Sequence, residues 1–261
     1  MPERAQILTA IRAAAARVGL NLCAAVPLER YDARVEAGMR ASAIDPAARS
    51  ILVLGNGGGA FWQAFKRHAE RHPGWFARDN PLDDFTRELV EGTIAAPLRE
   101  AALRYTIVHP FMAGGRSLNF VELGKAAGIA GPSILGVVVH PKYGPWIAFR
   151  AALLLEVELD APGEALNFDP CPGCTVRGCI GACPVGAVSF PAGWDVPKCL
   201  THRVENEPDC AGRCHARAGC VIGPEHRYPD DELAYHQRRA LGAMRPYYET
   251  HIKPRRRDAG T

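Results

Sequence analysis

The chain has 261 residues, enough to bury a full hydrophobic core and to carry a small appended module. Its apolar fraction of 48% and its charged fraction of 23% are ordinary for a globular protein. The formal net charge of +3 is small, and much of it lies in the basic tail over 253–257. No basic face of the folded part can therefore be claimed, and we do not expect nucleic acid as a partner.

The N-terminal residues and the lengths of the apolar runs indicate the cellular compartment. The first residues, Met-Pro-Glu-Arg-Ala-Gln, lack the apolar region of a secretory signal. No run of about 18 apolar residues is present, so we expect no membrane span and no membrane partner. The chain is therefore predicted to be cytoplasmic, where thiols stay reduced. Clustered cysteines in that setting indicate metal binding rather than disulfides.

In the first half of the chain, helical and strand patterns alternate. Ile7, Ile11, Ala14 and Val18 recur at helical spacing, and Gly19 is placed to end that helix. Apolar, β-branched runs predict strands, the second of which leads into a glycine-rich turn. The predicted elements are a helix over 7–18, strands over 20–26 and 50–54, a turn over 55–59 and a helix over 60–69.

The second half continues the alternation. Asn80-Pro81 has the residue types of a helix start. A strand over 134–139 and another over 146–159 flank a turn-rich segment, which predicts an antiparallel hairpin at the centre of a layered domain. The other predicted elements are a strand over 105–108, a helix over 118–127 and a last helix over 230–244.

The cysteines divide the chain into a cysteine-poor part and a cysteine-rich part. Cys23 stands alone and is expected to be a small buried hydrophobe. The other eight lie within one segment of about 50 residues and are the predicted metal ligands: Cys171, Cys174, Cys179, Cys183, Cys199, Cys210, Cys214 and Cys220.

The first four of these resemble the ligand run of bacterial ferredoxins, C-x2-C-x2-C-x3-C-P, whose fourth cysteine binds the other of two clusters. Here two extra residues separate Cys174 from Cys179, and Cys183 is followed by Pro184 as in the pattern. Crossed ligation predicts two [4Fe–4S] clusters, one held by Cys171, Cys174, Cys179 and Cys220 and the other by Cys183, Cys199, Cys210 and Cys214.

Two other metal assignments stay open. A four-cysteine zinc site is the main competitor, although zinc ribbons usually contain two C-x2-C pairs and only Cys171 and Cys174 have that spacing. A single cluster is the other, because the spacings around Cys210 and Cys214 are irregular.

Three features of the first domain carry weaker signals. The segment 55–60 matches G-x-G-x-x-A between a strand and a helix, but no strand precedes the acidic residue that a dinucleotide site needs. His140 lies in a turn, where capping is its ordinary role. Arg150 lies within an apolar strand and requires a partner for its charge.

Two segments resemble known families. Residues 134–150, with His140-Pro141-Lys142-Tyr143-Gly144-Pro145-Trp146, resemble a segment of CblC-type cobalamin-processing proteins. Residues 123–131 resemble the Ala-Gly-Leu/Ile-Gly segment of epoxyqueuosine reductases, which precedes a hairpin and a two-cluster ferredoxin module. The resemblance covers roughly residues 45–225.

The resemblance implies a nitroreductase/flavin-reductase-like α+β domain that binds cobalamin, followed by a ferredoxin-like [4Fe–4S] module. The implied boundaries are 1–162 for the corrinoid-binding-like domain, 163–225 for the iron–sulfur module and 226–261 for a C-terminal helix and basic tail. The matching positions, carried over as candidate corrinoid contacts, are Gly128, Ile129, Gly131, His140, Gly144, Trp146 and Arg150.

One departure concerns catalysis. Epoxyqueuosine reductases have an aspartate, acting as general acid, at the position that corresponds to Gly114 here. Residues beyond 225 also lack the helical-repeat domain that some of those enzymes use for tRNA. We therefore assign no catalytic residue.

The resemblance and the cysteines together predict a redox protein that reduces or processes a corrinoid with electrons from an external donor protein. A ferredoxin-like carrier without corrinoid, an epoxyqueuosine-reductase-like tRNA modification enzyme, and a flavin in place of the corrinoid are the alternatives. The fold analogy also admits a homodimer.

Overall fold

The computed structural model describes residues 4–111, 117–159 and 167–253. These residues form two compact units, each built from two stretches of chain. The first unit comprises Met1–Gly131 and Ile147–Phe168, and the second comprises Pro132–Trp146 and Asp169–Thr261. The division differs from the predicted domain boundaries because residues 132–146 pack with the cysteine-rich part.

A four-stranded antiparallel sheet, in the order β1-β2-β4-β3, forms the centre of the first unit. Leu52 on β2 lies opposite Ala25 on β1 and Leu153 on β4, and Leu153 also lies opposite Ile107 on β3. The strands are β1 (Leu22–Pro27), β2 (Ser50–Gly57), β3 (Tyr105–Val108) and β4 (Ile147–Leu155).

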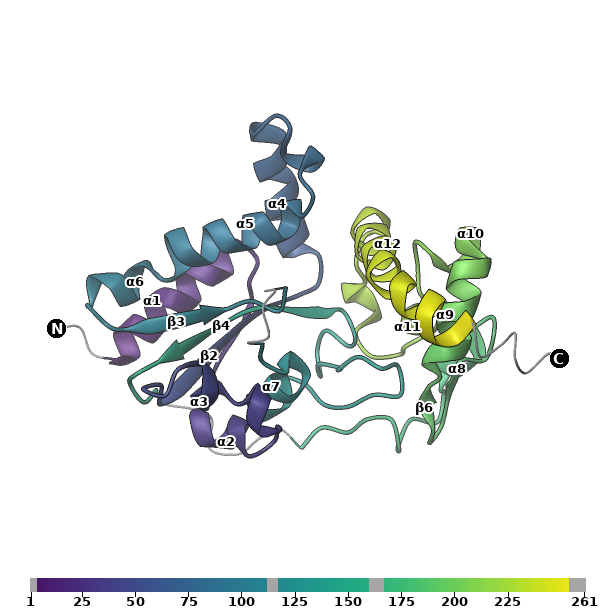
Figure 1. Cartoon of the computed structure of the whole chain (residues 1–261), viewed down its shortest axis with the longest axis horizontal. Coiled ribbons are helices and arrows are strands. Elements are labelled where there is room, and N and C mark those ends of the chain that lie inside the picture. Colours follow the sequence, from purple (N-terminus) through teal and green to yellow (C-terminus); the bar gives the residue numbers. More distant parts are fainter. Residues whose placement is uncertain (1–3, 112–116, 160–166, 254–261) are drawn as a thin grey trace. The chain divides into compact units, whose positions relative to one another are not determined.

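Helices cover both faces of this sheet (Figure 1). One face carries α1 (Arg4–Arg17), α5 (Pro81–Leu89) and α6 (Ala96–Glu100), and the other carries α2 (Leu28–Asp32), α3 (Ala41–Ile44) and α7 (Phe120–Ala126). Because neither face meets water, every residue of β2 is buried. The predicted mixed α+β class is confirmed for this unit.

Other elements of the first unit are short, apart from α4 (Ala60–Arg71), which follows β2. They are η1 (Ala37–Met39), η2 (Trp75–Ala77) and η3 (Val90–Ile94). The glycine-rich segment is less of a turn than predicted, since β2 continues to Gly57. A bulge between Leu54 and Gly55 and the close approach of the Ala148 carbonyl explain why glycine suits this place.

The predicted hairpin of residues 134–139 with residues 146–159 is wrong. β4 pairs with β2 and β3, whereas residues 134–139 belong to none of the strands; an isolated bridge joins His140, which follows them, to Gly144. Gly136 has a left-handed φ of 74°, and a Cβ there would lie 2.3 Å from the ring of Trp194. The apolar run of residues 134–139 therefore packs within the cysteine-rich unit instead of joining the sheet.

The second unit is built from short helices and one two-stranded sheet. Its larger core cluster consists of Leu200, Leu241, Tyr248 and Ile252, and a smaller one consists of Trp146, Tyr228 and Leu233. Its elements are α8 (Gly178–Ala182), β5 (Val188–Ser189), β6 (Gly193–Trp194), α9 (Val196–Glu205), α10 (Glu207–Cys210), α11 (His215–Ala218), η4 (Pro224–His226), α12 (Asp230–Tyr247) and η5 (Tyr248–Ile252).

Across the described ranges, we find no helix that combines the length and the apolar character needed to cross a membrane.

Candidate functional site

The eight clustered cysteines line two separate cavities of the second unit, four in each. The first cavity is lined by Cys171, Cys174, Cys179 and Cys220, together with apolar residues such as Ile134 and Val139. The second is lined by Cys183, Cys199, Cys210 and Cys214. This grouping is the one that crossed ligation predicts, and all nine cysteines of the chain are free thiols.

Helix α8 connects the two cavities. Cys179 lies in this helix and lines the first cavity, whereas Cys183 follows directly after it and lines the second. Four residues of helix correspond to about 6 Å along its axis. The two thiol groups are therefore held close together by one rigid turn of chain.

A close contact between two glycines brings the distant Cys220 to the first cavity. A Cβ on Gly178 would lie 2.6 Å from the carbonyl oxygen of Gly219, so only glycine permits α8 and the end of α11 to approach so closely. Gly178 precedes Cys179 and Gly219 precedes Cys220. The contact thus places the thiols of these two cysteines at the same cavity.

Backbone N–H groups point at several of the sulfur atoms. The amide of Arg177 donates to Cys174 Sγ at 3.4 Å, that of Ala187 to Cys183 Sγ at 3.2 Å, and that of Arg217 to Cys214 Sγ at 3.4 Å. Such donors stabilise a thiolate over a thiol. Hydrogen bonds to sulfur are also a means by which proteins tune iron–sulfur clusters.

Crowding of the thiols opposes their ionisation. Burial raises the pKa of Cys210 to about 12, and the charges of Asp209, Cys214 and Cys199 act in the same direction. Burial likewise raises the pKa of Cys179 and of Cys220, and each has thiolate neighbours from the first group. A bound cation reverses this balance, because coordinated thiols lose their protons.

The donor set fits a metal centre of four thiolates in each cavity. Structural zinc sites with four cysteine ligands and cubane iron–sulfur centres both use such a set. The second cavity has a volume of about 200 Å³, more room than a single ion needs, whereas the first is tighter at about 30 Å³.

Three donor groups suited to a single metal ion lie at the edge of the second cavity. Single donor atoms of His202, Asp209 and Cys210 lie within 4.8 Å of one another. The Asp209 carboxylate pairs with His202 Nε2 at 3.0 Å and with His215 Nε2 at 3.1 Å. Because Cys210 belongs to both groups, this site and a four-cysteine centre exclude each other.

The candidate corrinoid contacts of the first unit lie in tightly packed backbone. Gly128 has a left-handed φ of 65°, and Ile129 is buried. A Cβ on Gly131 would lie 1.7 Å from the carbonyl oxygen of Phe168. Packing within the unit therefore accounts for glycine at position 131.

Arg150 is buried and has the partner that its charge requires. Its Nε donates to Asn56 Oδ1 at 2.8 Å, and its guanidinium carbon lies 5.2 Å from the ring centroid of Phe61. Nδ1 of His109 lies 3.0 Å from the Arg150 carbonyl oxygen, and burial lowers the pKa of this histidine. The sequence required a partner for Arg150, but it carried no signal that singled out Asn56.

The remaining candidate contacts belong to the second unit. His140 Nδ1 accepts hydrogen bonds from the backbone of Lys142 at 2.9 Å and of Tyr143 at 3.2 Å, which is the capping role. A Cβ on Gly144 would lie 1.9 Å from the Ile222 carbonyl oxygen, and Trp146 is only 1% exposed. Contacts within this unit thus occupy all three positions.

Two further expectations concern the first unit. A dinucleotide site at residues 55–60 is not supported, because it requires a parallel βαβ unit and the described sheet is antiparallel throughout. Gly114, which stands where a catalytic aspartate is expected by resemblance, lies outside the described residues.

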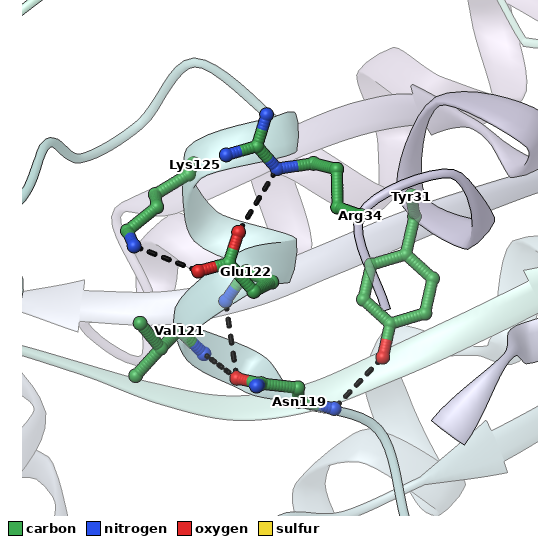
Figure 2. A network of polar contacts seen from close by, with 6 residues as sticks. All are labelled: Tyr31, Arg34, Asn119, Val121, Glu122 and Lys125. Carbon is green, nitrogen blue, oxygen red and sulfur yellow. Dashed lines mark hydrogen bonds and ion pairs between the residues drawn. The ribbon is translucent and has the colours of Figure 1, made fainter. Parts of the chain in front are cut away.

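A polar network fixes the start of α7, which leads into the Gly128–Gly131 segment (Figure 2). The Tyr31 hydroxyl donates to the Met39 carbonyl at 3.0 Å and accepts from the Asn119 amide at 2.8 Å. Asn119 caps α7, and Glu122 pairs with Lys125 and Arg34. Burial raises the pKa of Tyr31 to about 12.

Comparison with known proteins finds a sequence relative over part of the chain and solved structures of the same fold. No family model matches. The chain is 30% identical over 122 residues to an epoxyqueuosine reductase of Gloeobacter violaceus, covering 43% of this chain and 36% of that protein. It thus spans about a third of the length of the curated relative that it matches.

Two solved structures share the fold at low sequence identity. The B12-trafficking protein CblC of C. elegans superposes with a TM-score of 0.60 and 16% identity, covering 95% of this chain and 98% of that one. An epoxyqueuosine reductase of Bacillus subtilis superposes with a TM-score of 0.56 and 15% identity, covering 87% of this chain and 68% of that one. The resemblance is therefore confirmed in sequence for epoxyqueuosine reductases and in fold for both epoxyqueuosine reductases and CblC-type proteins.

Proposed function

We propose that the chain is an iron–sulfur redox protein that holds two [4Fe–4S] clusters and uses them to reduce or process a bound corrinoid such as cobalamin. The single observation that carries the proposal is the division of eight cysteines into two cavities of four, joined by α8. Bound clusters would supply one-electron transfer. Free thiols suit a reducing compartment, which supports a cytoplasmic location.

The ligand assignment follows the cavities. Cys171, Cys174, Cys179 and Cys220 would hold one cluster, and Cys183, Cys199, Cys210 and Cys214 the other. The amides of Arg177, Ala187 and Arg217 would hold thiolate charge at three of these sulfurs. Zinc in either cavity is the competing occupant.

The proposal that the protein binds a corrinoid rests on its similarity to known proteins. A sequence relative is an epoxyqueuosine reductase, and a protein of the same fold traffics B12. Corrinoid contacts would come from positions that the resemblance marks: Gly128, Ile129, Gly131, His140, Gly144, Trp146 and Arg150. An external protein would deliver electrons.

Anaerobic metal analysis tests the cluster assignment. We expect about eight iron and about eight acid-labile sulfide per chain, with an absorption spectrum of cubane clusters. Cys179→Ser and Cys183→Ser alter different cavities, so each is expected to lose about half of the iron. Cys23→Ser is the control, because Cys23 lies on β1, in the first unit. Colourless protein that contains zinc and no sulfide would contradict the proposal.

Titration with cobalamin tests whether the protein binds a corrinoid. Corrinoid binding is expected to shift the absorption bands of the corrin as protein is added under anaerobic conditions. If the purified protein is yellow and releases flavin on denaturation, the bound cofactor is a flavin and not a corrinoid. An unchanged corrin spectrum at high protein concentration would favour a ferredoxin-like carrier, which the inward packing of Gly144 and Trp146 already suits.

Epoxyqueuosine reduction on tRNA is the second candidate, since the curated relative carries that name. Residues 112–116 read Met-Ala-Gly-Gly-Arg and contain no carboxylate to serve as the expected proton donor. Unchanged queuosine in tRNA after deletion of the gene would dismiss this candidate.

A further inference from the structure

Arg203 is a buried cation of the second unit that lines the second cysteine cavity. It lies on α9 four residues after Cys199, so the two side chains lie on the same face of this helix. Only 8% of Arg203 is exposed. Arginine is almost never buried to this extent unless its charge is paired, so the position requires a partner.

The protein itself satisfies only part of this guanidinium. One terminal nitrogen, Nη2, donates to the Gln237 carbonyl at 2.7 Å. The Nε atom is buried and has no hydrogen-bond partner, and no carboxylate of the described residues forms an ion pair with Arg203. A buried cation without an anion is costly, so a negatively charged group in the cavity would be stabilised there.

The charge of Arg203 acts on a thiol of this cavity. Burial raises the pKa of Cys199, whereas a hydrogen bond from the Trp194 side chain and the charge of Arg203 oppose the rise. At Cys210, by contrast, burial and the Asp209 carboxylate both raise the pKa. The positive charge therefore acts on the side of the cavity that Cys199 occupies.

A cubane cluster held by four thiolates is an anion, and it gains a further negative charge when it is reduced. Its reduction potential depends on nearby charge and on hydrogen bonds to its sulfur atoms. Arginine stays protonated at all ordinary pH values, and its N–H groups can only donate. A buried guanidinium beside the cluster therefore favours the reduced form over the oxidised form.

We propose that Arg203 donates its Nε–H to a sulfur atom of the cluster in the second cavity and raises the reduction potential of that cluster. The inference rests on the proposed function, because it requires a cluster at Cys183, Cys199, Cys210 and Cys214. One electron from the external donor protein converts the oxidised cluster to the reduced one. No bond is made or broken in this step, and Arg203 keeps its proton.

The first cavity lacks a comparable donor among its lining residues, of which Arg177 is the one charged member. The Nε atom of Arg177 already donates to the Cys174 carbonyl at 3.1 Å, and its guanidinium lies 4.0 Å from the ring centroid of Phe190. Arg177 is also only half-buried, so water screens its charge. We therefore expect Arg203 to act mainly on the second cluster.

Redox titration followed by electron paramagnetic resonance tests Arg203 in chains that keep one complete set of cysteines. In the Cys179→Ser chain, which keeps the second set, Arg203→Met is expected to lower the ratio of reduced to oxidised cluster about tenfold at a fixed potential. This change corresponds to a midpoint potential lower by about 59 mV. In the Cys183→Ser chain, which keeps the first set, the same substitution is expected to cause a smaller shift. Arg239→Met is the matched control, since Arg239 is exposed and lines neither cavity.

Arg203→Lys keeps the charge and distinguishes a role towards the cluster from a role in packing. It is expected to retain the iron and sulfide of the second cavity and a midpoint potential closer to that of wild type than Arg203→Met has. If Arg203→Met loses this cluster and Arg203→Lys keeps it, the anionic cluster requires the charge, as proposed. Loss of the cluster in both variants would overturn the inference, because the residue would then serve the fold.

An unchanged midpoint potential in iron-replete Arg203→Met protein would overturn the inference and leave the proposed function intact. Equal shifts in the Cys179→Ser and Cys183→Ser chains would overturn it as well. Wild-type protein without iron or sulfide would instead remove the proposed function and this inference together.

Discussion

At the scale of single residues, close backbone approaches explain several glycines that family resemblance marks as ligand contacts. Gly131 faces the Phe168 carbonyl, and Gly144 faces that of Ile222. A side chain at either place would collide with backbone, which has little freedom to move. These glycines are thus required by packing whether or not a corrinoid also contacts them.

Gly131→Ala is expected to reduce the free energy of unfolding by about 2 kcal/mol, because its Cβ would overlap the Phe168 carbonyl oxygen. Denaturation in urea, followed by circular dichroism, measures the change. Gly38→Ala is the control, since nothing lies within 4 Å of a Cβ there. Equal stability of the two variants, combined with loss of corrinoid binding in Gly131→Ala, would instead favour a ligand-contact role.

Arg150 illustrates how far residue-level reasoning reaches. A guanidinium within an apolar strand must have a hydrogen-bond acceptor, and this much follows from the cost of burying charge. The acceptor is Asn56, on the neighbouring strand β2. The pairing depends on the register of β2 with β4 and on the bulge beside Gly55. Neither feature can be read from the residues alone.

At the scale of elements, the buried phenol of Tyr31 connects α2 to the start of α7. Its hydroxyl accepts from the Asn119 amide and donates to the carbonyl of Met39, the last residue of η1. Asn119 also accepts hydrogen bonds from the amides of Val121 and Glu122 (Figure 2). One phenol therefore orients the helix that leads into residues 128–131.

Tyr31→Phe is expected to cost about 1 kcal/mol at pH 8, because the Asn119 amide loses its acceptor. Burial raises the folded-state pKa of Tyr31 from 10.0 to about 12, so above pH 10 the unfolded chain releases this proton first. The advantage of wild type over the variant is therefore present below pH 10 and declines towards pH 12. Urea denaturation at pH 8 and pH 11 measures the difference in the free energy of unfolding between wild type and Tyr31→Phe at each pH.

Tyr247→Phe controls for other alkaline effects, since Tyr247 is exposed. A gap between wild type and Tyr31→Phe that widened with pH would contradict the raised pKa.

Most elements of the first unit were predictable because their patterns are local. The strand predicted over 105–108 matches β3, and the helix predicted over 60–69 matches most of α4. The predicted hairpin failed because residues 134–139 have the composition of a strand but pack within the cysteine-rich unit. Periodicity identifies an apolar run without indicating which surface covers it.

The cysteine cavities show the opposite case. The two cavities group the cysteines as the ferredoxin pattern predicts, even though Cys199, Cys210, Cys214 and Cys220 are irregularly spaced. That these cysteines bind clusters stays a prediction. Crossed ligation depends on chain order, and chain order tolerates insertions. The donors from Arg177 and Arg217 and the pair of histidines at Asp209 could not be foreseen, because they depend on the local turns.

At the scale of the whole molecule, the two units differ in what stabilises them. In the first unit, two helical layers enclose the sheet and bury β2 completely. Among the described residues of the second unit, small clusters of buried apolar side chains form around Leu200 and around Trp146. Small cores ordinarily need a metal or disulfides to remain folded, and the cysteines here are free thiols. We therefore expect metal binding to stabilise the second unit selectively.

Removal of iron with a chelator and a mild oxidant, under anaerobic conditions, is expected to separate the unfolding of the two units. A bound metal would contribute binding free energy to the folded form of the second unit, so its loss should lower the unfolding temperature of that unit alone. Calorimetry should then show a shifted transition and an unshifted one. Limited proteolysis should cut first within the second unit, in residues 132–146 or 169–253.

Reconstitution with iron and sulfide is the control and should restore the original transition. Cys179→Ser should shift the same transition by less than complete removal does, since the second cavity keeps its four cysteines. If the metal-free protein unfolded at an unchanged temperature, the apolar clusters around Leu200 and Trp146 would be sufficient to hold the unit. The cavities would then be preformed in the folded chain, and metal would enter them without contributing to its stability.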